Sequence, residues 1–443
     1  MKPICLLGCC FFLVIASCGR YGFEGPDNLD ACLDAGSPDA GSPDGDSLDG
    51  DTGPADSGSP DAGTGTPWAS LGPEHWPALQ AQLQDAAAMG STEEATVREI
   101  PCSLSNSAFQ GIILAPNGLI YGIPRDSPQL GELNTMASSD PTARLVGPDI
   151  GGEDNWYGVA LAGDRMFYCP PSDTKYPLRF DPDDVDNAAE ITAVDLGLSQ
   201  DDENKWMGLR LAPNGLLIAC PRSDEYVLAI DPEDLSAGGI RRVGPNLGSR
   251  PAKWYTGVLA PNGKIYCVPG ADPQILEIDP ENLTDTGIQR LGPDFGTGLG
   301  KWYGAALAPN GNIYATPGNN HFVLEIVPED IDSSGPVGPD LLTGSSKWTG
   351  GTLAPNGRIY ASPGNQGQVL EIDPENLTAE GIRRVGIDLG ATEGRKYFGG
   401  VLAPNGKIYA LPFVDKQSIL EIDPHARANF DMNVLLNGHL NGQ

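Results

Sequence analysis

Short runs of alternating hydrophobic and polar residues fill the chain from residue 96 to residue 424, and one pattern occurs there seven times. Each copy has an aromatic residue, a glycine-rich pair, a segment close to Leu-Ala-Pro-Asn-Gly-x-Ile-Tyr, a proline, and a segment close to Val-Leu-Glu-Ile-Asp-Pro. Alternating runs separated by glycine, asparagine and proline predict β-strands joined by turns. The first leucines of the seven copies are Leu114, Leu161, Leu211, Leu259, Leu307, Leu353 and Leu402.

Successive copies are 46 to 50 residues apart, close to the roughly 40 to 50 residues of a four-stranded propeller blade. The fourth copy predicts strands at 255–260, 264–268, 274–279 and 288–291, with Asn262-Gly263 as a type I′ hairpin turn. Fourth strands follow six copies, near Leu145, Ile191, Ile240, Ile288, Pro336 and Ile382. The seventh copy lacks one, and residues 96–100 carry the missing pattern. We therefore predict an all-β fold, a seven-bladed β-propeller of antiparallel blades closed by an N-terminal strand.

Composition agrees with many short strands, since the chain has 58 glycines, 40 prolines and 40% hydrophobic residues. Its 27 basic and 59 acidic residues give a net charge of −32. Such a chain repels phosphate overall, so we expect no nucleic-acid partner. We expect a monomer.

Residues 1–17 form an apolar leader of the signal-peptide type, followed by Cys18. Ile15-Ala16-Ser17-Cys18 resembles a bacterial lipobox, and this resemblance implies cleavage before Cys18, diacylation of its sulphur and acylation of its amino group. An ordinary secretory signal is the alternative. Several acyl chains make a stable membrane anchor. Gly19 stands where, in the best-known sorting rule, an aspartate retains lipoproteins in the inner membrane, so the cell envelope and its outer membrane are favoured.

Beyond the leader, the chain divides into four segments. Residues 18–67 predict a disordered tether rich in Asp, Gly, Ser and Pro, because 11 acids and one base within 19–67 leave little to bury. Residues 68–95 predict a helical connector, with its helix at 74–89. Residues 96–424 are the propeller, and residues 425–443 a tail or cap on its rim. The Asp-Gly-Asp runs of the tether lack the spacing of calcium loops, so a charged linker is favoured over a calcium site.

Five cysteines lie beyond the leader, namely Cys32, Cys102, Cys169, Cys220 and Cys267. An odd number leaves at least one thiol unpaired, although an exported protein can form disulfides. The last three fall within strands of different copies, and we interpret them as small buried residues. Pairing of Cys32 with Cys102 stays open.

The repeats resemble the bacterial propeller class that includes virginiamycin B lyase-like, gluconolactonase-like and NHL-type proteins, over about three quarters of the chain. This class includes lyases, lactonases and non-catalytic binders. The lyase resemblance implies a histidine with acidic partners and magnesium. His321 is the sole histidine of the repeats, in Asn319-Asn320-His321-Phe322, so it is the alternative catalytic residue. A solvated loop histidine is the simpler interpretation, and we expect no cofactor, with magnesium or calcium as the alternative.

The first residues of each innermost strand are the candidate ligand-binding residues, because loops at one end of the blades would bring them to the channel mouth. Five lysines and seven aromatic residues would form a collar that binds a protein, a glycan or a small anion. In the alternative, the aromatic residues fill the gaps between blades and the lysines pair with preceding aspartates. The collar is Phe109, Trp156, Lys205, Trp206, Lys253, Trp254, Lys301, Trp302, Lys347, Trp348, Lys396 and Tyr397.

Recurring glutamates of the third strands, Glu277, Glu325, Glu371 and Glu421, could serve acid–base chemistry, but cross-strand pairing with fourth-strand arginines explains the repetition better. Serine-nucleophile, phosphate-loop and metal-spaced histidine motifs are not found in the sequence. The prediction is a membrane-anchored, non-catalytic binding module. A lyase or hydrolase and an envelope scaffold are the alternatives.

Overall fold

The computed structural model describes residue 81, residues 93–425 apart from 105–107, 137–139, 152–153, 191, 193–195, 199–202, 393 and 414–415, and residues 441–442. The predicted signal peptide, the tether, most of the connector and most of the tail lie outside the described residues. Among the described residues, no helix has the length and hydropathy needed to cross a bilayer.

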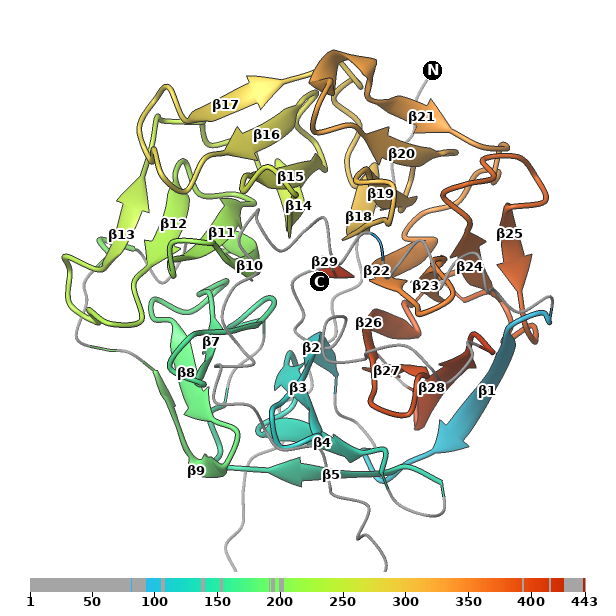
Figure 1. The fold of residues 1–443 in the computed structure, drawn as a ribbon. Coiled ribbons are helices and arrows are strands. Elements are labelled where there is room, and N and C mark those ends of the chain that lie inside the picture. Colours follow the sequence, from blue (N-terminus) through green and yellow to red (C-terminus); the bar gives the residue numbers. More distant parts are fainter. Residues whose placement is uncertain are drawn as a thin grey trace, which may run out of the picture. The chain divides into compact units, whose positions relative to one another are not determined.

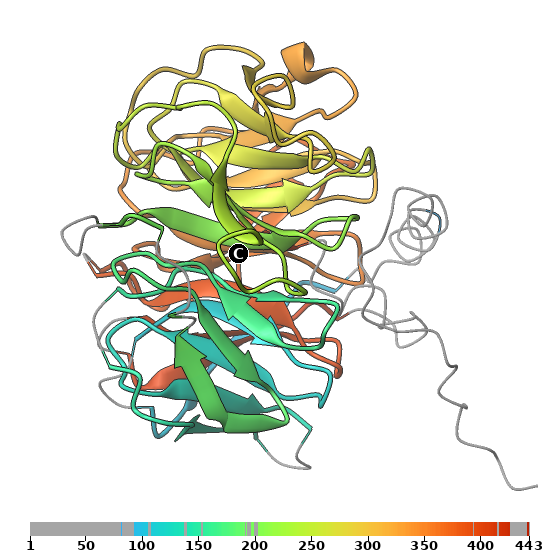
Figure 2. The same ribbon diagram turned by 90° about the vertical axis from the view of Figure 1, so that its left-hand side faces the viewer.

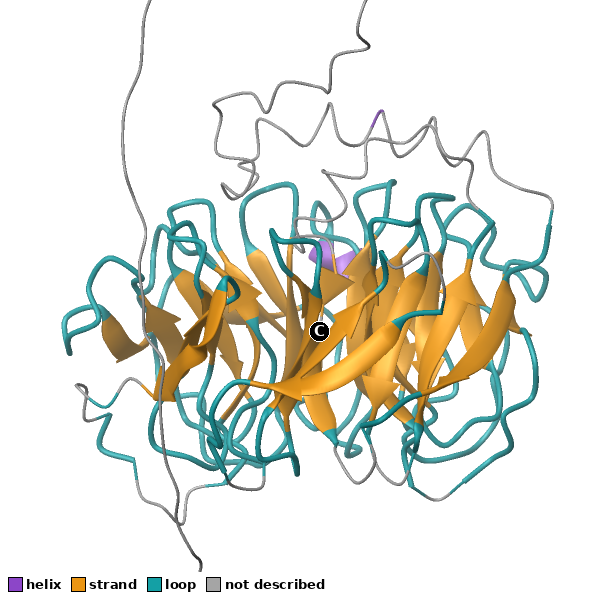
Figure 3. Ribbon diagram, turned by 90° about the horizontal axis from the view of Figure 1, so that it is seen from below, coloured by secondary structure: helices purple, strands orange, loops and turns teal. Residues whose placement is uncertain are grey.

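Seven antiparallel sheets surround a central channel, which confirms the predicted seven-bladed propeller (Figure 1). Seen from the side, the strands occupy one layer and the loops extend from both of its faces (Figures 2 and 3). Each blade runs outward from its first strand to its fourth, because short hairpins join neighbours in sequence. Side chains of adjacent blades share the core; one buried cluster combines residues of blades 3 and 4.

The first two blades contain β2 (Phe109–Leu114), β3 (Ile120–Pro124), β4 (Leu130–Asn134), β5 (Thr142–Val146), β6 (Ala160–Leu161), β7 (Phe167–Cys169), β8 (Leu178–Asp181) and β9 (Asp184–Glu190). Blades 3 and 4 contain β10 (Trp206–Leu211), β11 (Leu217–Pro221), β12 (Val227–Ile230), β13 (Ile240–Val243), β14 (Trp254–Leu259), β15 (Ile265–Pro269), β16 (Ile275–Ile278) and β17 (Ile288–Leu291).

Blades 5 and 6 contain β18 (Trp302–Leu307), β19 (Ile313–Pro317), β20 (Val323–Ile326), β21 (Gly335–Val337), β22 (Trp348–Leu353), β23 (Ile359–Pro363), β24 (Val369–Ile372) and β25 (Ile382–Val385). A 3-10 turn, η2 (Ile331–Ser333), precedes β21. The seventh blade contains β26 (Tyr397–Leu402), β27 (Ile408–Pro412), β28 (Ser418–Asp423) and β1 (Thr96–Pro101).

The ring closes through β1, as the sequence predicts. β1 pairs with β28 in register from Thr96 opposite Asp423 to Pro101 opposite Ser418. Arg98 of β1 donates from Nε and Nη2 to the two carboxylate oxygens of Glu421, at 2.7 and 3.0 Å. The seventh blade therefore consists of strands from both ends of the repeat region, and this pairing holds the ring together.

The hairpin turn differs from the predicted type I′ turn. In the fourth blade, Gly263 N donates to Ala260 O at 3.0 Å, and Ala260 N donates to Lys264 O at 2.8 Å. Gly263 has a φ of +82°, whereas Asn262 does not have a positive φ. These features define a type I turn followed by a left-handed glycine. Proline before the asparagine explains the difference, because its fixed negative φ suits the first central position of a type I turn.

Residues 441–442 of the tail lie inside the ring. They form β29 (Asn441–Gly442), which pairs with the innermost strand β18 through Ala306 opposite Asn441 and Ala305 opposite Gly442 (Figure 1). An innermost strand has one edge without a blade partner, so its backbone can pair with an added strand.

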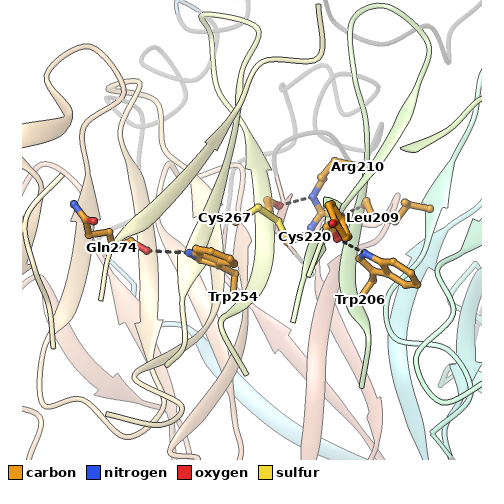
Figure 4. Close-up of a disulfide and its surroundings, with 9 residues drawn as sticks. Trp206, Leu209, Arg210, Cys220, Trp254, Cys267 and Gln274 are labelled. Atoms are coloured by element: carbon orange, nitrogen blue, oxygen red, sulfur yellow. Dashed lines mark hydrogen bonds between the residues drawn. A yellow bond between two sulfur atoms is a disulfide. The ribbon is translucent and has the colours of Figure 1, made fainter. Parts of the chain in front are cut away.

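The interpretation of three cysteines as unpaired buried residues is wrong for two of them. Cys220 and Cys267 form a disulfide between β11 and β15, in neighbouring blades (Figure 4). Cys169 is buried and free, as expected. The prediction failed because the repeat register places Cys220 and Cys267 on facing sides of the same blade interface, which spacing along the chain does not show.

In some blades, the glutamates of the third strand form the cross-strand contacts that the sequence predicts. Glu371 accepts from Arg383 Nε at 3.1 Å, and Glu421 accepts from Arg98. In the fourth blade Glu277 instead accepts from Lys264 Nζ and from the Tyr266 hydroxyl. These carboxylates therefore stabilise the blades.

Candidate functional site

The predicted aromatic collar is a buried packing layer. The indole rings of the five tryptophans are fully buried, and each Nε1 donates to the backbone carbonyl 20 residues later, at 2.8 to 3.0 Å. Figure 4 shows this bond from Trp254 to Gln274. Tyr397 is equally buried and contacts the Ser418 hydroxyl at 2.9 Å. The donors are Trp156, Trp206, Trp254, Trp302 and Trp348, which the structure therefore does not offer to a ligand.

The collar lysines are buried as well. Lys301 Nζ donates to the backbone carbonyls of Gly270, Asp272 and Gly296 at 2.8 to 2.9 Å. Burial lowers the pKa of four of these lysines to about 8. Their ammonium groups join loops of neighbouring repeats through carbonyl oxygens, not through the expected aspartate carboxylates. The five buried lysines are Lys205, Lys253, Lys301, Lys347 and Lys396.

A β-bulge near the start of the inner strand changes the direction of the side chain that follows the collar aromatic residue. In six blades the pairing of the first and second strands shifts directly after the first residues of the inner strand, for example between Trp254 and Gly257. Bulges re-aim side chains. Tyr157, Tyr255, Tyr303 and Phe398, which each follow a collar aromatic residue, belong to four different blades and yet pack into one cluster. Side chains at this position therefore gather around the channel axis.

A cavity of about 440 Å³ lies at this end of the channel. Its residues come from the inner strands, from the loops that precede them and from the loops between the second and third strands. The described lining is Gln110, Arg125, Asp154, Tyr157, Asn204, Arg222, Tyr255, Ser345, Ser346, Asn365, Gly394, Arg395 and Phe413.

Three arginines give this cavity its charge. The Arg222 guanidinium lies 5.4 Å from the Tyr255 ring centroid, and the Arg395 guanidinium lies 4.9 Å from that of Tyr303. Neither is ion-paired with a carboxylate of the described residues. Arg125 differs, because its Nε lies 2.9 Å from Asp154 Oδ1. Arg395 Nη2 also donates to the Tyr303 hydroxyl at 3.3 Å, so contacts with the aromatic residues hold the guanidinium in place while its other N–H groups can bind a ligand.

The aromatic rings fit here because glycines make room for them. A Cβ on Gly270 would lie 2.3 Å from the Tyr255 ring, and one on Gly318 would lie 2.2 Å from the Tyr303 ring. Burial raises the pKa of both Tyr157 and Tyr255, so their hydroxyls stay protonated at neutral pH. The cavity therefore combines cationic guanidinium groups, neutral phenols, side-chain amides and serine hydroxyls.

His321 does not line this cavity. Its Nδ1 lies 3.1 and 3.3 Å from the carboxylate oxygens of Asp340, and both side chains are about half-exposed. Within the described part of the chain, no three His, Cys, Asp or Glu side chains gather closely enough to hold a metal ion. The magnesium-dependent site implied by the lyase resemblance is thus not assembled around His321 by the described residues.

Six of the cavity residues missed from the sequence occupy two repeat positions next to those considered, and the others, among them Asn365 and Arg395, lie elsewhere in the loops. One position follows the collar aromatic residue and reads Gln110, Tyr157, Met207, Tyr255, Tyr303, Thr349 and Phe398. The other follows the proline of the second strand, or its second proline in blade 2, and reads Arg125, Ser172, Arg222, Gly270, Gly318, Gly364 and Phe413. Both positions vary from copy to copy, whereas the collar repeats. This variation among the copies could have identified both positions from the sequence, because a binding site needs unlike groups.

Comparison with known proteins shows what the fold resembles. No protein-family model matches the chain, and no curated protein matches its sequence. A streptogramin B lyase superposes with a TM-score of 0.55 at 12% identity, over 74% of this chain and 97% of the lyase. Virginiamycin B lyase from Staphylococcus aureus superposes with 0.56 at 11% identity, over 74% and 99%.

The extracellular domain of a putative hybrid two-component system from B. thetaiotaomicron superposes with a TM-score of 0.55 at 14% identity, over 76% of this chain and 44% of that one. At these identities the likeness is one of fold. The predicted resemblance to virginiamycin B lyase-like propellers is confirmed at that level.

Proposed function

We propose that this protein is a non-catalytic binding module of the cell envelope that holds a small anionic ligand in the cavity at its channel mouth. The observation that carries the proposal is the pair Arg222 and Arg395, whose guanidinium groups line the cavity without a carboxylate partner among the described residues. A buried or half-buried charge normally has a counter-charge. The ligand would supply it.

The surrounding charge makes these arginines distinctive. The whole chain has a net charge of −32, so a cationic cavity does not arise from a general excess of basic residues. Of the described lining residues, Asp154 alone is acidic, and it lies against Arg125. The local field therefore favours an anion inside the cavity even though the molecule repels anions at long range.

A lyase is the second candidate because virginiamycin B lyase shares the fold. Such an activity needs a general base close to the ligand. The described lining residues include no histidine, and their one carboxylate, Asp154, accepts hydrogen bonds from Gln110 and Arg125. Binding without chemistry is therefore the better fit to the described cavity.

Thermal unfolding in the presence of anions tests the binding site. Sodium phosphate, sodium sulfate and sodium glucuronate are compared with sodium chloride at equal ionic strength, since a ligand that binds the folded state raises Tm. We expect at least one anion to raise Tm in the wild type and to have no such effect in Arg222→Gln/Arg395→Gln. Arg241→Gln, on an outer strand, is the matched control. An equal response of both variants would contradict the proposal.

Membrane anchoring is tested separately through Cys18. Cys18→Ala removes the acylation site that the lipobox resemblance implies. We expect the variant to leave the membrane fraction, whereas Cys10→Ala, within the leader, stays with the membrane as the wild type does. Separation of the two bacterial membranes by density then reports which one holds the protein; we expect the outer membrane. Unchanged fractionation of Cys18→Ala would refute the anchor.

A further inference from the structure

Buried polar atoms without partners concentrate at the cavity. Among the described residues, five buried side-chain nitrogen or oxygen atoms have no hydrogen-bond partner. Three of them belong to residues that line this cavity, namely Gln110 Oε1, Arg222 Nε and Asn365 Oδ1. Buried polar atoms in folded proteins nearly always have partners. Their concentration here indicates that the partners come from a molecule that enters the cavity.

These three atoms require opposite kinds of partner. Arg222 Nε carries a proton and needs an acceptor, whereas the two amide oxygens need donors. The amide orientations are fixed by their nitrogens: Gln110 Nε2 donates to Asp154, and Asn365 Nδ2 donates to Ser345 O at 2.8 Å. Turning either amide over would place oxygen against oxygen. A complementary ligand must therefore offer both hydrogen-bond donors and an anionic acceptor.

The donor requirement separates classes of anion. Sulfate brings acceptor oxygens only, and it would leave both amide oxygens without partners. A carboxylate matches the planar fork of a guanidinium group through two parallel hydrogen bonds. Hydroxyl groups on the same ligand would supply the donors for Gln110 and Asn365. Ser345 and Ser346 add hydroxyls that can donate to or accept from further ligand hydroxyls.

The aromatic residues of the cavity indicate which kind of ligand skeleton carries the carboxylate and the hydroxyl groups. Tyr157, Tyr255 and Phe413 line the same cavity. Their rings form an apolar wall between the polar groups, with the Arg222 guanidinium against Tyr255 and the Arg125 guanidinium against Phe413; the C–H groups of a sugar ring suit such a wall. The cavity, at about 440 Å³, falls within the roughly 300 to 1,000 Å³ of small-molecule sites.

We infer that the cavity recognises a sugar acid of the uronate type, either free or as a unit of an acidic glycan. Arg222 and Arg395 bind the carboxylate, Gln110 and Asn365 accept from ring hydroxyls, and the apolar wall of aromatic residues borders the C–H groups of the sugar. The inference rests on the proposed anion site and narrows it to one chemical class.

Calorimetric titration of the purified full-length protein tests the class of ligand with matched probes. Galacturonic acid is compared with galactose, which lacks the carboxylate, with cyclohexanecarboxylic acid, which lacks the hydroxyls, and with sulfate. We expect galacturonic acid to bind at least tenfold more tightly than each of the other three. Trigalacturonic acid distinguishes the two sources, since tighter binding of the trimer than of the monomer identifies a glycan unit.

Substitution of Asn365 tests whether its amide oxygen contributes to the selectivity for the sugar acid. Asn365→Leu removes one amide acceptor, and we expect it to reduce the preference for galacturonic acid over cyclohexanecarboxylic acid at least threefold. Asn246→Leu, on an outer loop, is the matched control and should keep the full preference.

Two outcomes would overturn this inference in different ways. If sulfate or cyclohexanecarboxylic acid binds as tightly as galacturonic acid and Arg222→Gln/Arg395→Gln abolishes that binding, the anion site stands and the sugar-acid assignment is wrong. If none of the four probes binds, both the assignment and the anion site are wrong.

Discussion

At the scale of single residues, the buried lysines are strongly perturbed cations of this propeller. Lys253, Lys301, Lys347 and Lys396 occupy the same position in four repeats, and burial lowers the pKa of each to about 8. Backbone carbonyls, and not carboxylates, solvate their ammonium groups. Each ammonium group therefore loses its hydration on folding and gains hydrogen bonds to carbonyl oxygens, which join successive loops.

This perturbation predicts a specific pH dependence for Lys301. Its pKa is about 8 in the folded protein and 10.5 ordinarily, so between these values the unfolded state binds more protons. Stability should then rise with pH in this window. We expect the free energy of unfolding, measured by denaturant titration from pH 8.0 to 9.5, to rise less steeply in Lys301→Met than in the wild type. Lys175→Met, in a loop, should keep the wild-type slope. Equal slopes in all three proteins would disprove the prediction.

For the inner strands, the predicted and observed site residues differ by one position in the chain, whereas Arg222 and Asn365 come from loops in which no residue was predicted. The sequence indicates which loops form the channel mouth, and the cavity lies there. It also indicates Trp254 as a ligand residue, whereas Tyr255 lines the cavity. Simple alternation cannot locate the bulge that separates their roles, because the bulge depends on pairing with the second strand.

At the scale of the strand, closure of the ring depends on β1 and its contacts with β28. Burial disfavours ionisation of Glu421, but hydrogen bonds from Arg98, Lys407 and Tyr409 outweigh it and lower the pKa of Glu421 to about 2. This one carboxylate therefore joins β1 to β27 and β28. The N-terminal strand and the last repeat are connected here only through non-covalent contacts.

Substitution of Glu421 should weaken that closure. Hydrogen bonds to a charged group contribute about 1.5 to 3 kcal/mol, and we expect Glu421→Gln to lose about that much stability at pH 7. Because the pKa of Glu421 is lower in the folded state, its contribution is complete above pH 4.5 and is lost as the pH falls toward 2. Urea unfolding at pH 7 and pH 3 should show a smaller deficit at pH 3. Exposed Glu375→Gln is the control, and a deficit independent of pH would contradict this account.

The elements themselves were largely predictable because seven copies reinforce one another. The strands of the fourth blade differ from the predicted ranges by one residue at most ends, and β1 was recognised by its pattern. The turn type was not predicted correctly, since Asn262-Gly263 suggests type I′ until Pro261 is considered. β29 could not be predicted either, because its two residues carry no strand pattern and pair only with a distant strand.

At the scale of the whole molecule, the ring consists of seven similar interfaces between blades, and one of them is covalently linked. The interface of blades 3 and 4 contains the Cys220–Cys267 disulfide between buried sulphur atoms (Figure 4). Cys220 belongs to the same strand–loop segment as Arg222 of the proposed ligand cavity, two residues earlier in the chain. A disulfide also fits export to an oxidising compartment.

Removal of this disulfide should destabilise the whole ring, because blades of one closed propeller unfold together when an interface opens. The bond closes a loop with a sequence separation of 47 residues, for which about 2 to 4 kcal/mol of stabilisation is typical. Cys220→Ala/Cys267→Ala avoids burying new hydroxyl groups and should lower Tm by several degrees, measured by calorimetry. Reductant should lower the Tm of the wild type toward that of the variant and leave the variant unchanged. If the wild type and the variant unfold at the same temperature without reductant, the link does not stabilise the ring.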